Sequence, residues 1–192
     1  MRDIILASSS IYRRRLLAKL KINFSHQSPE IDESSIAGES LEQLSLRLAI
    51  EKAKALQPLY PNALIIGSDQ VASLKGQRLH KPGNHAQATK QLKQCSGQDV
   101  VFFTSICVIN NSTEKQQVSV EINTVSFRKL NTTQIERYLK LEKPYDCAGS
   151  FKMEGLGISL FTHIKGDDPN ALIGLPLIRL VDMLSHEDIN IP

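Results

Sequence analysis

The sequence predicts an α/β fold, a mixed β-sheet with helices on its faces, and three observations predict it. In the first half of the chain, short apolar runs of strand length alternate with stretches of helix length. Two longer runs rich in β-branched and aromatic residues follow at residues 100–109 and 118–127. Between them, residues 110–113 have the composition of a turn. Alternating strands and helices favour parallel pairing and a hairpin adds antiparallel pairing, so we expect both in one sheet.

The first elements follow one another closely. Residues 4–7 are short, continuous and apolar, which predicts a buried strand. The serines at 8–10 then offer N-cap oxygens to a helix over residues 11–20. We expect a second strand near residues 24–28, and we expect the polar stretch 29–39 to be a loop.

The next helix and strand have clear sequence signals. A capping-box pattern at Ser40 and Gln43 predicts that a long helix begins there and continues to about residue 56. Residues 64–67 are again short, continuous and apolar, which predicts a third buried strand. We expect this strand to end where the polar residues 68–70 follow.

The second half of the chain adds helices around the predicted hairpin. Asn84 is a candidate N-cap for a helix up to residue 94. After the hairpin, we expect a helix at residues 132–141, a strand at 158–164 and a last helix at 176–185. The last helix begins with proline, a residue suited to a first helical turn.

The composition is that of one globular domain of ordinary size. The chain has 192 residues, of which 41% are hydrophobic and 22% charged, values that exclude collagen-like, coiled-coil and broadly disordered chains. Its 23 basic and 20 acidic residues give a net charge of +3. Apart from Arg13, Arg14 and Arg15, the basic residues are spread along the chain. Since duplex-binding proteins concentrate basic charge in a stripe, we expect no nucleic-acid partner.

The sequence favours the cytoplasm. No apolar stretch approaches the roughly 20 residues needed to span a bilayer, so we expect no membrane partner. A strand-like run follows Met1-Arg2-Asp3 where a secretory signal would have a long apolar segment. Cys95, Cys107 and Cys147 are far apart, a spacing that fits neither a disulfide framework nor a paired cysteine metal site. We expect buried, reduced thiols.

Candidate chemistry lies just beyond the predicted strands, where open α/β sheets bind ligands. The chain has no G-x-x-x-x-G-K-[ST], G-x-G-x-x-G or G-x-S-x-G motif, so the usual sequence support for phosphate-loop, dinucleotide and serine-hydrolase sites is missing. The serines at 8–10 with Arg13 could bind an anion, or could be an N-cap beside a solvated helix face. Asp69 could bind a divalent metal or orient a water, or could be a turn aspartate bonded to its own backbone.

Other polar residues have the types that phosphate-ester chemistry uses. Lys52 and Lys81 could offset phosphate charge, although singly each is typical of a solvated surface, as is the acid Glu33. The glycine-containing stretch 149–155 could fold over a ligand or be a plain connection. Together these residues form a consistent set, since cations offset phosphate charge while an acid positions metal or water. Because no His or Cys ligand spacing is present, Glu33 and Asp69 are the candidate ligands of Mg²⁺ or Mn²⁺.

The sequence resembles the Maf family of nucleoside triphosphate pyrophosphatases over nearly its whole length. The blocks that carry the resemblance are Leu6-Ala7-Ser8-Ser9-Ser10, Arg13-Arg14 with Leu16-Leu17, Pro29-Glu30-Ile31-Asp32-Glu33, Glu51-Lys52-Ala53, Ile66-Gly67-Ser68-Asp69-Gln70, Lys81-Pro82, Ala148-Gly149-Ser150-Phe151 and Ile173-Gly174-Leu175-Pro176. So many blocks in one order are a specific signal.

The resemblance implies an elongated α/β fold similar to that of inosine triphosphate pyrophosphatases, formed by residues 1–192 as one domain. It also implies release of pyrophosphate from a nucleoside triphosphate with a divalent cation, and it suggests a homodimer. By position, Asp69 matches the family's proton acceptor, with Glu33, Lys52 and Lys81 as its polar partners. Ser8 and Arg13 match the phosphate-binding turn.

The resemblance also bears on the base. Tyr12, Gln70 and Glu154 fall at the positions associated with base choice, and the last two match the branch that cleaves 7-methyl-GTP. The branch acting on dTTP and UTP typically has Arg, Thr and Gln at the three places. This chain has Tyr12 where the methylguanine branch typically has Trp, and Ile11 where a proline is common.

Several alternatives follow from the same residues. The chain could be a dTTP/UTP pyrophosphatase of the same family, or a non-catalytic nucleotide-binding regulator of cell division. Tyr12 could stack on a cationic methylated base and Glu154 could accept its hydrogen bonds. Alternatively, Tyr12 only packs on the first helix and Glu154 is a solvated loop acid.

Overall fold

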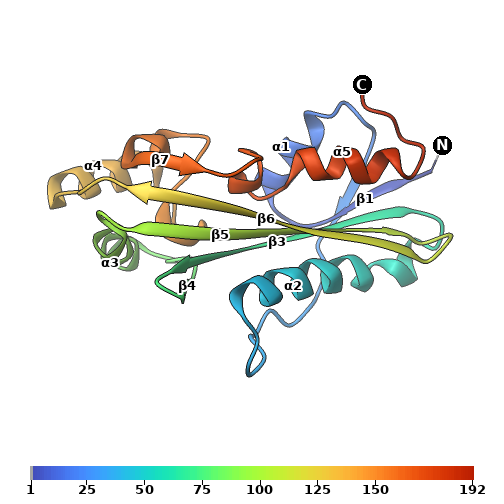
Figure 1. Cartoon of the computed structure of the whole chain (residues 1–192), viewed down its shortest axis with the longest axis horizontal. Helices are drawn as coiled ribbons and strands as arrows, with labels where there is room; N and C mark the ends of the chain where they lie inside the picture. The colour runs from blue at the N-terminus through green and yellow to red at the C-terminus, as the bar shows by residue number, and fades with distance from the viewer. Residues whose placement is uncertain (1) are drawn as a thin grey trace. The chain divides into compact units, whose positions relative to one another are not determined.

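The computed structural model describes residues 2–192 and contains a seven-stranded mixed sheet (Figure 1). The strands are β1 (Ile4–Ala7), β2 (Ser25–Gln27), β3 (Leu64–Leu74), β4 (Gln77–Leu79), β5 (Asp99–Asn110), β6 (Lys115–Phe127) and β7 (Phe161–Lys165). Their order is β2-β1-β3-β5-β6-β7, with β4 paired to β3. β1 is parallel to β2 and β3, whereas β3 with β4 and β6 with β7 are antiparallel. The predicted fold class and the long hairpin are therefore confirmed.

Five α-helices accompany the sheet within residues 2–192. They are α1 (Ile11–Ala18), α2 (Leu41–Ala55), α3 (His85–Cys95), α4 (Thr132–Glu142) and α5 (Leu177–Ser185). Short 3₁₀ helices occupy Gln57–Leu59, Ala148–Ser150, Leu156–Leu160 and Ala171–Ile173. The predicted caps are confirmed: Ser10 and Asn84 cap α1 and α3, and Ser40 forms the capping box with Gln43 at α2. Within residues 2–192, we find no helix with the length and apolar character of a membrane span.

The chain divides into two compact units, each built from separate segments. The first unit comprises the chain up to Gln70, Thr104–Glu121 and Asp168–Pro192. The second comprises Val71–Phe103 and Ile122–Asp167. The strands β3, β5 and β6 each contribute residues to both units. The expectation that residues 1–192 act as one domain stays a prediction.

The first unit has apolar clusters on both faces of its strands. Along β1, Ile4 and Leu6 pack in one cluster with residues of α1 and α5, while Ile5 and Ala7 pack in the other with α2. This two-sided burial is the reason that the strand reads as a continuous apolar run. Figure 1 shows α2 on one face of the sheet and α1 with α5 on the other.

Gly67 lets α2 lie directly against β3. A Cβ atom at this position would collide with the carbonyl oxygen of Ala49 and lie 2.8 Å from the amide nitrogen of Ala53. Both partners are backbone atoms of α2, so the helix cannot give way without shifting as a whole. This close approach places the following turn of α2 beside the next residues of β3.

The second unit has an aromatic core. Phe151 packs edge-to-face with Phe161 at a ring-centroid distance of 4.8 Å, and Phe127 packs with Phe161 at 5.0 Å. Phe102 also contacts Phe151, at 5.4 Å. These ring pairs fix the chain at residue 151, just before the turn that carries Glu154.

Three predicted boundaries are wrong. β3 does not end at residue 67 but continues to Leu74, because its last residues pair with β4 across a tight turn. β7 begins at Phe161 and not at residue 158, since the preceding residues form a 3₁₀ helix. Pro176 is the N-cap of α5 and lies outside its first turn.

Candidate active site

A lysine bridges two acids within the first unit. The Nζ atom of Lys52 lies 2.5 Å from Oδ1 of Asp69 and 2.7 Å from Oε1 of Glu33. Lys52 and Asp69 are buried, with 7% and 6% of their surfaces exposed, whereas the Glu33 side chain is 53% exposed. Two charges removed from water require close pairing. The arrangement is therefore a buried ion pair with a third, solvent-facing partner.

Asp69 is held by β3 and not by a turn. The interpretation of Asp69 as a turn aspartate is wrong, because the residue lies inside the strand. Side chains alternate along a strand, so Asp69 points towards α2 while its neighbours point the other way. The Oγ of Ser68 donates to the carbonyl oxygen of Gly174 at 3.1 Å.

Gln70, the other neighbour, is engaged through its amide nitrogen. Its Nε2 donates to Oγ1 of Thr104 at 3.0 Å and to the carbonyl oxygens of Ala171 and Leu172 at 2.9 and 3.1 Å. Thr104 itself donates to the carbonyl oxygen of Ala171 at 2.9 Å. Gln70 thus ties β3 to the segment before α5.

Arg13 extends the cluster of charges. Its Nε donates to the carbonyl oxygen of Gly174 at 2.8 Å, the same acceptor that Ser68 uses. Burial lowers the pKa of the Arg13 guanidinium, and the negative charges of Asp69 and Glu33 oppose that shift. The guanidinium is therefore within electrostatic reach of both acids, and its cationic form is supported by them.

The serine turn lies between β1 and α1. Ser8 is buried, and its Oγ accepts a hydrogen bond from the amide of Ser10 at 3.1 Å. The Oγ of Ser10 accepts from the amide of Arg13 at 3.4 Å and so caps α1. Tyr12 is half-buried on the same helix. The N-cap interpretation is confirmed, and anion binding at this helix start stays a prediction.

Two carboxylates of this cluster could hold a divalent cation beside a bound phosphate. No group of three or more His, Cys, Asp and Glu side chains forms a metal site within residues 2–192. Glu33 and Asp69 nevertheless offer carboxylate oxygens on either side of Lys52. In nucleotide sites, Mg²⁺ is commonly bound through one or two carboxylates with the substrate phosphates completing the shell. The pair has the composition of such a site.

Lys81 and Glu154, the other two predicted site residues, belong to the second unit. Lys81 is exposed between β4 and α3, two residues before Gly83, whose amide donates to the carbonyl oxygen of Tyr145 at 2.9 Å. Glu154 is exposed in the turn at residues 153–155. The structure brings Ser8, Tyr12, Arg13, Glu33, Lys52, Asp69 and Gln70 into the first unit and describes these two residues in the second.

The end of α4 holds the Glu154 turn. The amide of Lys152 donates to the hydroxyl of Tyr138 at 3.0 Å, and the amide of Leu156 donates to Oε1 of Glu142 at 2.8 Å. A Cβ atom on Gly155 would lie 2.7 Å from the Glu142 carboxylate. The turn is thus fixed by its backbone, with Glu154 projecting outwards.

Comparison with known proteins decides the family. Residues 3–187 match the Maf-like protein family. The chain belongs to the Maf family. It is 54% identical over 191 residues, the full length of both chains, to a 7-methyl-GTP pyrophosphatase of Methylobacillus flagellatus. It is 52% identical over 192 residues, again the full length of both, to a 7-methyl-GTP pyrophosphatase of Pseudomonas aeruginosa.

A solved structure supports the fold of this Maf chain. The Staphylococcus aureus Ham1 protein superposes with a TM-score of 0.55 at 15% identity. The match covers 97% of this chain and 100% of that one. At such low identity the likeness concerns the fold alone.

The candidate site of this Maf chain contains three residues that sequence reasoning missed as participants. Ser68, Thr104 and Gly174 form the hydrogen bonds that orient Arg13 and Gln70. Ser68 and Gly174 lie within the sequence blocks that carry the family resemblance, which could have drawn attention to them. Thr104 lies within a predicted strand and has no local signal.

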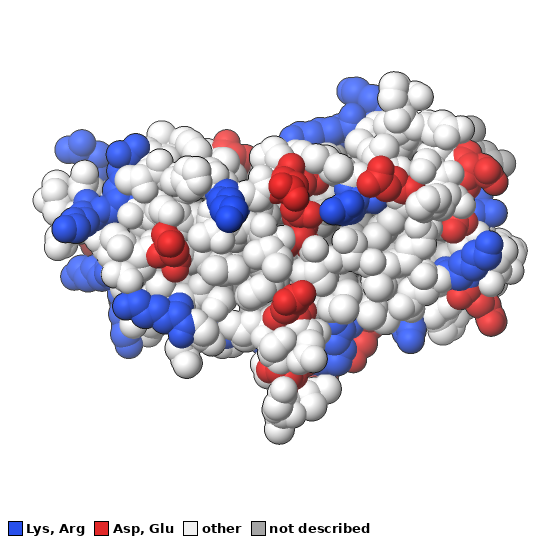
Figure 2. Space-filling view, viewed as in Figure 1, with Lys and Arg blue, Asp and Glu red and all other residues white. Residues whose placement is uncertain are grey.

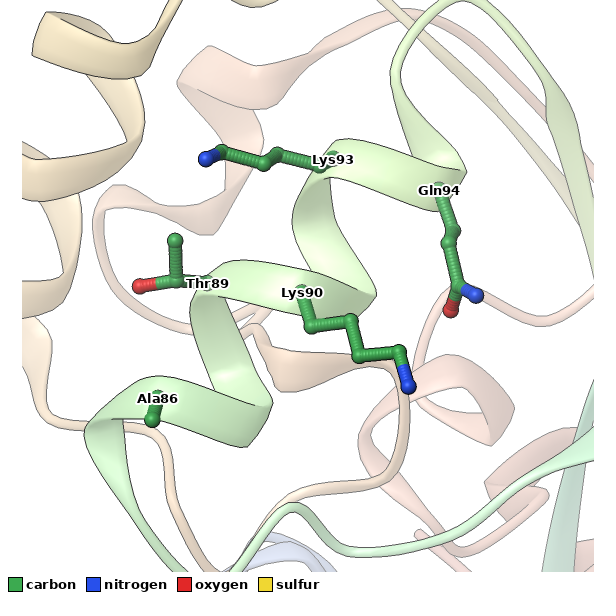
Figure 3. Close-up of a pocket in the computed structure, with 5 residues that line it drawn as sticks. All are labelled: Ala86, Thr89, Lys90, Lys93 and Gln94. Carbon is green, nitrogen blue, oxygen red and sulfur yellow. The ribbon is translucent and has the colours of Figure 1, made fainter.

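Two surface features of this Maf chain involve other residues. An open hollow of about 520 Å³ runs along α3, lined by Ala86, Thr89, Lys90, Lys93 and Gln94 (Figure 3). No predicted site residue lines it. Figure 2 shows acidic and basic side chains interspersed on the face in view, without a continuous basic stripe. The expected absence of a nucleic-acid partner stays a prediction.

Proposed function

We propose that the chain hydrolyses 7-methyl-GTP to 7-methyl-GMP and pyrophosphate. The observation that carries the proposal is the buried pair of Asp69 and Lys52 with Glu33 as its exposed partner. Relatives that are more than half identical over their full length are named for this activity. The site supplies the carboxylates and the cationic side chains that the reaction needs.

In the proposed reaction, Asp69 accepts a proton from a water that attacks the α-phosphorus. The bond from this phosphorus to the oxygen that bridges to the β-phosphorus breaks, and pyrophosphate leaves. Lys52 and Arg13 offset the negative charge that builds up on the phosphate oxygens. Asp69 suits the role of base because β3 and Lys52 fix its carboxylate in one place.

Glu33 and Asp69 are the residues that would hold Mg²⁺ or Mn²⁺. A bound cation supplies positive charge beside the phosphates and the attacking water. We expect exhaustive chelation to abolish turnover and either metal to restore it. Turnover that is undiminished after chelation contradicts this part of the proposal.

Base recognition is assigned to Tyr12 and Glu154. Methylation at N7 makes guanine cationic, and a cation favours an aromatic face and a carboxylate. Glu154 offers a carboxylate at the tip of a fixed turn, and Tyr12 offers a ring on α1. The amide nitrogen of Gln70 is already bonded to Thr104 and to backbone carbonyls, which favours a supporting role for this residue.

One panel tests the proposal. Purified protein is given 7-methyl-GTP, GTP, dTTP and UTP, and both products of each reaction are identified. We expect monophosphate and pyrophosphate, with 7-methyl-GTP preferred over GTP by roughly tenfold or more. Diphosphate with orthophosphate means attack at the γ-phosphate and contradicts the proposed reaction. Faster cleavage of dTTP or UTP favours the other branch, and no cleavage of any nucleotide favours a non-catalytic regulator.

A further inference from the structure

We infer that Arg47 is a positioning residue that fixes the loop carrying Glu33, so that this carboxylate stays on Lys52. The inference rests on the proposed function for its effect on turnover, but the contact between Arg47 and the loop does not. Arg47 lies on α2, five residues before Lys52, and points to the loop between β2 and α2.

The guanidinium of Arg47 contacts this loop at two places, Ser34 and Glu39. Its Nη2 donates to the carbonyl oxygen of Ser34 at 2.8 Å, directly beside Glu33. Its Nε and Nη2 donate to the two carboxylate oxygens of Glu39 at 2.7 and 3.0 Å. Its Nη1 donates to Glu51 on the next turn of α2 at 3.0 Å. One side chain of α2 thus binds the loop at two residues and holds it against the helix.

The loop itself has little apolar material with which to pack. Residues 28–40 contain neither helix nor strand, and residues 32–38 are all exposed. The hydrogen bonds from the amide of Ser34 to Asp32 and from the amide of Ile36 to Glu39 are local to the loop. Ordering such a segment costs backbone conformational entropy at every residue. Contacts from outside the loop must therefore supply much of its order.

Arg47 is suited to this task by its chemistry. A guanidinium presents several donors in a rigid plane and can hold a carboxylate by two parallel bonds while binding a carbonyl with the same group. Hydrogen bonds to Glu39 raise the pKa of Arg47 above its usual value, so the residue is cationic. A lysine carries the same charge but lacks the planar set of donors. Arg47→Lys should therefore hold the loop only in part.

A double-mutant cycle tests the inference in turnover. Arg47→Ala should lower kcat/KM roughly tenfold or more in the wild-type background and less than about twofold in the Glu33→Gln background. Such non-additivity is expected only when Arg47 acts through Glu33. Lys54→Ala, an exposed residue of the same helix, is the control and should be neutral in both backgrounds. Equal losses in the two backgrounds overturn the inference.

Hydrogen exchange of the nucleotide-free protein tests the same inference without any activity. Arg47→Ala should speed exchange of the hydrogen-bonded loop amides of Ser34, Ile36 and Glu39 by roughly tenfold or more while leaving the amides of β3 unchanged. Unchanged exchange in the loop overturns the inference even if turnover falls. If the loop loosens but no nucleotide is cleaved by the wild-type protein, the proposed function fails and the role of Arg47 in fixing the loop stands.

Discussion

The two loops that carry candidate site acids are held by different forces. The Glu33 loop is held by ion pairs, from Lys52 to Glu33 and from Arg47 to Glu39. The Glu154 turn is held by backbone amides that bind the end of α4 and by a glycine pressed against the Glu142 carboxylate. The position of the first loop therefore depends on charge, and that of the second on hydrogen-bond geometry and volume.

This difference matches the proposed tasks of the two loops. Glu33 and Asp69 share Lys52, so a change of charge at any one of the three residues alters the ion pairs of the other two. Glu154 projects from a turn whose contacts do not involve its own carboxylate, so the side chain can be changed without loosening the turn. We expect variants of the first loop's cluster to affect turnover and variants of the second to affect the choice of base.

The largest effect is expected from Asp69→Asn. Loss of a positioned general base costs roughly 10²–10⁴-fold in rate. Glu33 still pairs with Lys52 in this variant, so the fold should remain intact. Steady-state kinetics measure the turnover, and circular dichroism measures whether the variant is folded. Near-wild-type turnover in a folded variant excludes Asp69 as the base.

Lys52→Ala should have the next largest effect, on stability as well as on rate. Removal of one partner of a buried ion pair leaves the other charge uncompensated, at a cost of about 3–5 kcal/mol. Here Asp69 is the buried charge left behind. Urea unfolding measures the free energy of unfolding, and Lys54→Ala is the matched control, with a change of about 0.5 kcal/mol or less. Equal stability of the two variants means that the buried pair has no net structural role.

Glu154→Gln should separate base choice from chemistry. A hydrogen bond to a charged group contributes about 1.5–3 kcal/mol, so kcat/KM for both 7-methyl-GTP and GTP should fall by roughly tenfold or more. The free energy of unfolding should not change, because Glu154 is exposed. Unaltered kinetics with both guanine nucleotides identify Glu154 as a solvated loop acid.

Gly155→Ala tests whether volume holds the second loop. The added methyl group would lie 2.7 Å from the Glu142 carboxylate. Because this carboxylate is the end of a flexible side chain, we expect it to move away and to weaken its hydrogen bond with the amide of Leu156. We expect a higher KM for 7-methyl-GTP with little change in its kcat. Glu142→Gln keeps an acceptor for the amide of Leu156 and should be milder. A lower kcat with an unchanged KM contradicts the division of tasks between the loops.

Local patterns predicted most elements of the fold but could not predict contacts between distant segments. The capping box at Ser40 involves residues three apart, and its chemistry is visible in the sequence. The extension of β3 to Leu74, which places Asp69 inside the strand, includes the pairing of Ala72–Leu74 with β4, and short apolar runs do not reveal that pairing. The junction of Lys52 with Asp69 depends on the close approach at Gly67, a matter of packing between α2 and β3.

The candidate site shows the same limit. Asp69, Lys52 and Glu33 were predicted as a set from residue type and family resemblance, but not that one ammonium group bridges both acids. Arg47 reads as an ordinary solvated residue of an amphipathic helix. Its pair with Glu51 has the i,i+4 spacing of a helix, but its partners in the loop lie 8 and 13 residues earlier in an irregular segment, where no periodicity applies.

The smallest effect is expected from Tyr12→Ala, and it bears most directly on the methyl group. Stacking of a cation on an aromatic face contributes about 0.5–2 kcal/mol, which corresponds to a factor of roughly two to thirty. Only the methylated base is cationic, so kcat/KM should fall for 7-methyl-GTP and change little for GTP. Tyr12→Trp introduces the residue typical of the methylguanine branch. This variant should increase the preference for 7-methyl-GTP over GTP, a change opposite to that of Tyr12→Ala. Tyr12 is half-buried on α1, so a purely structural role would lower both activities together with the melting temperature. Parallel losses for the two nucleotides therefore assign Tyr12 to helix packing, whereas a loss confined to 7-methyl-GTP assigns it to the base.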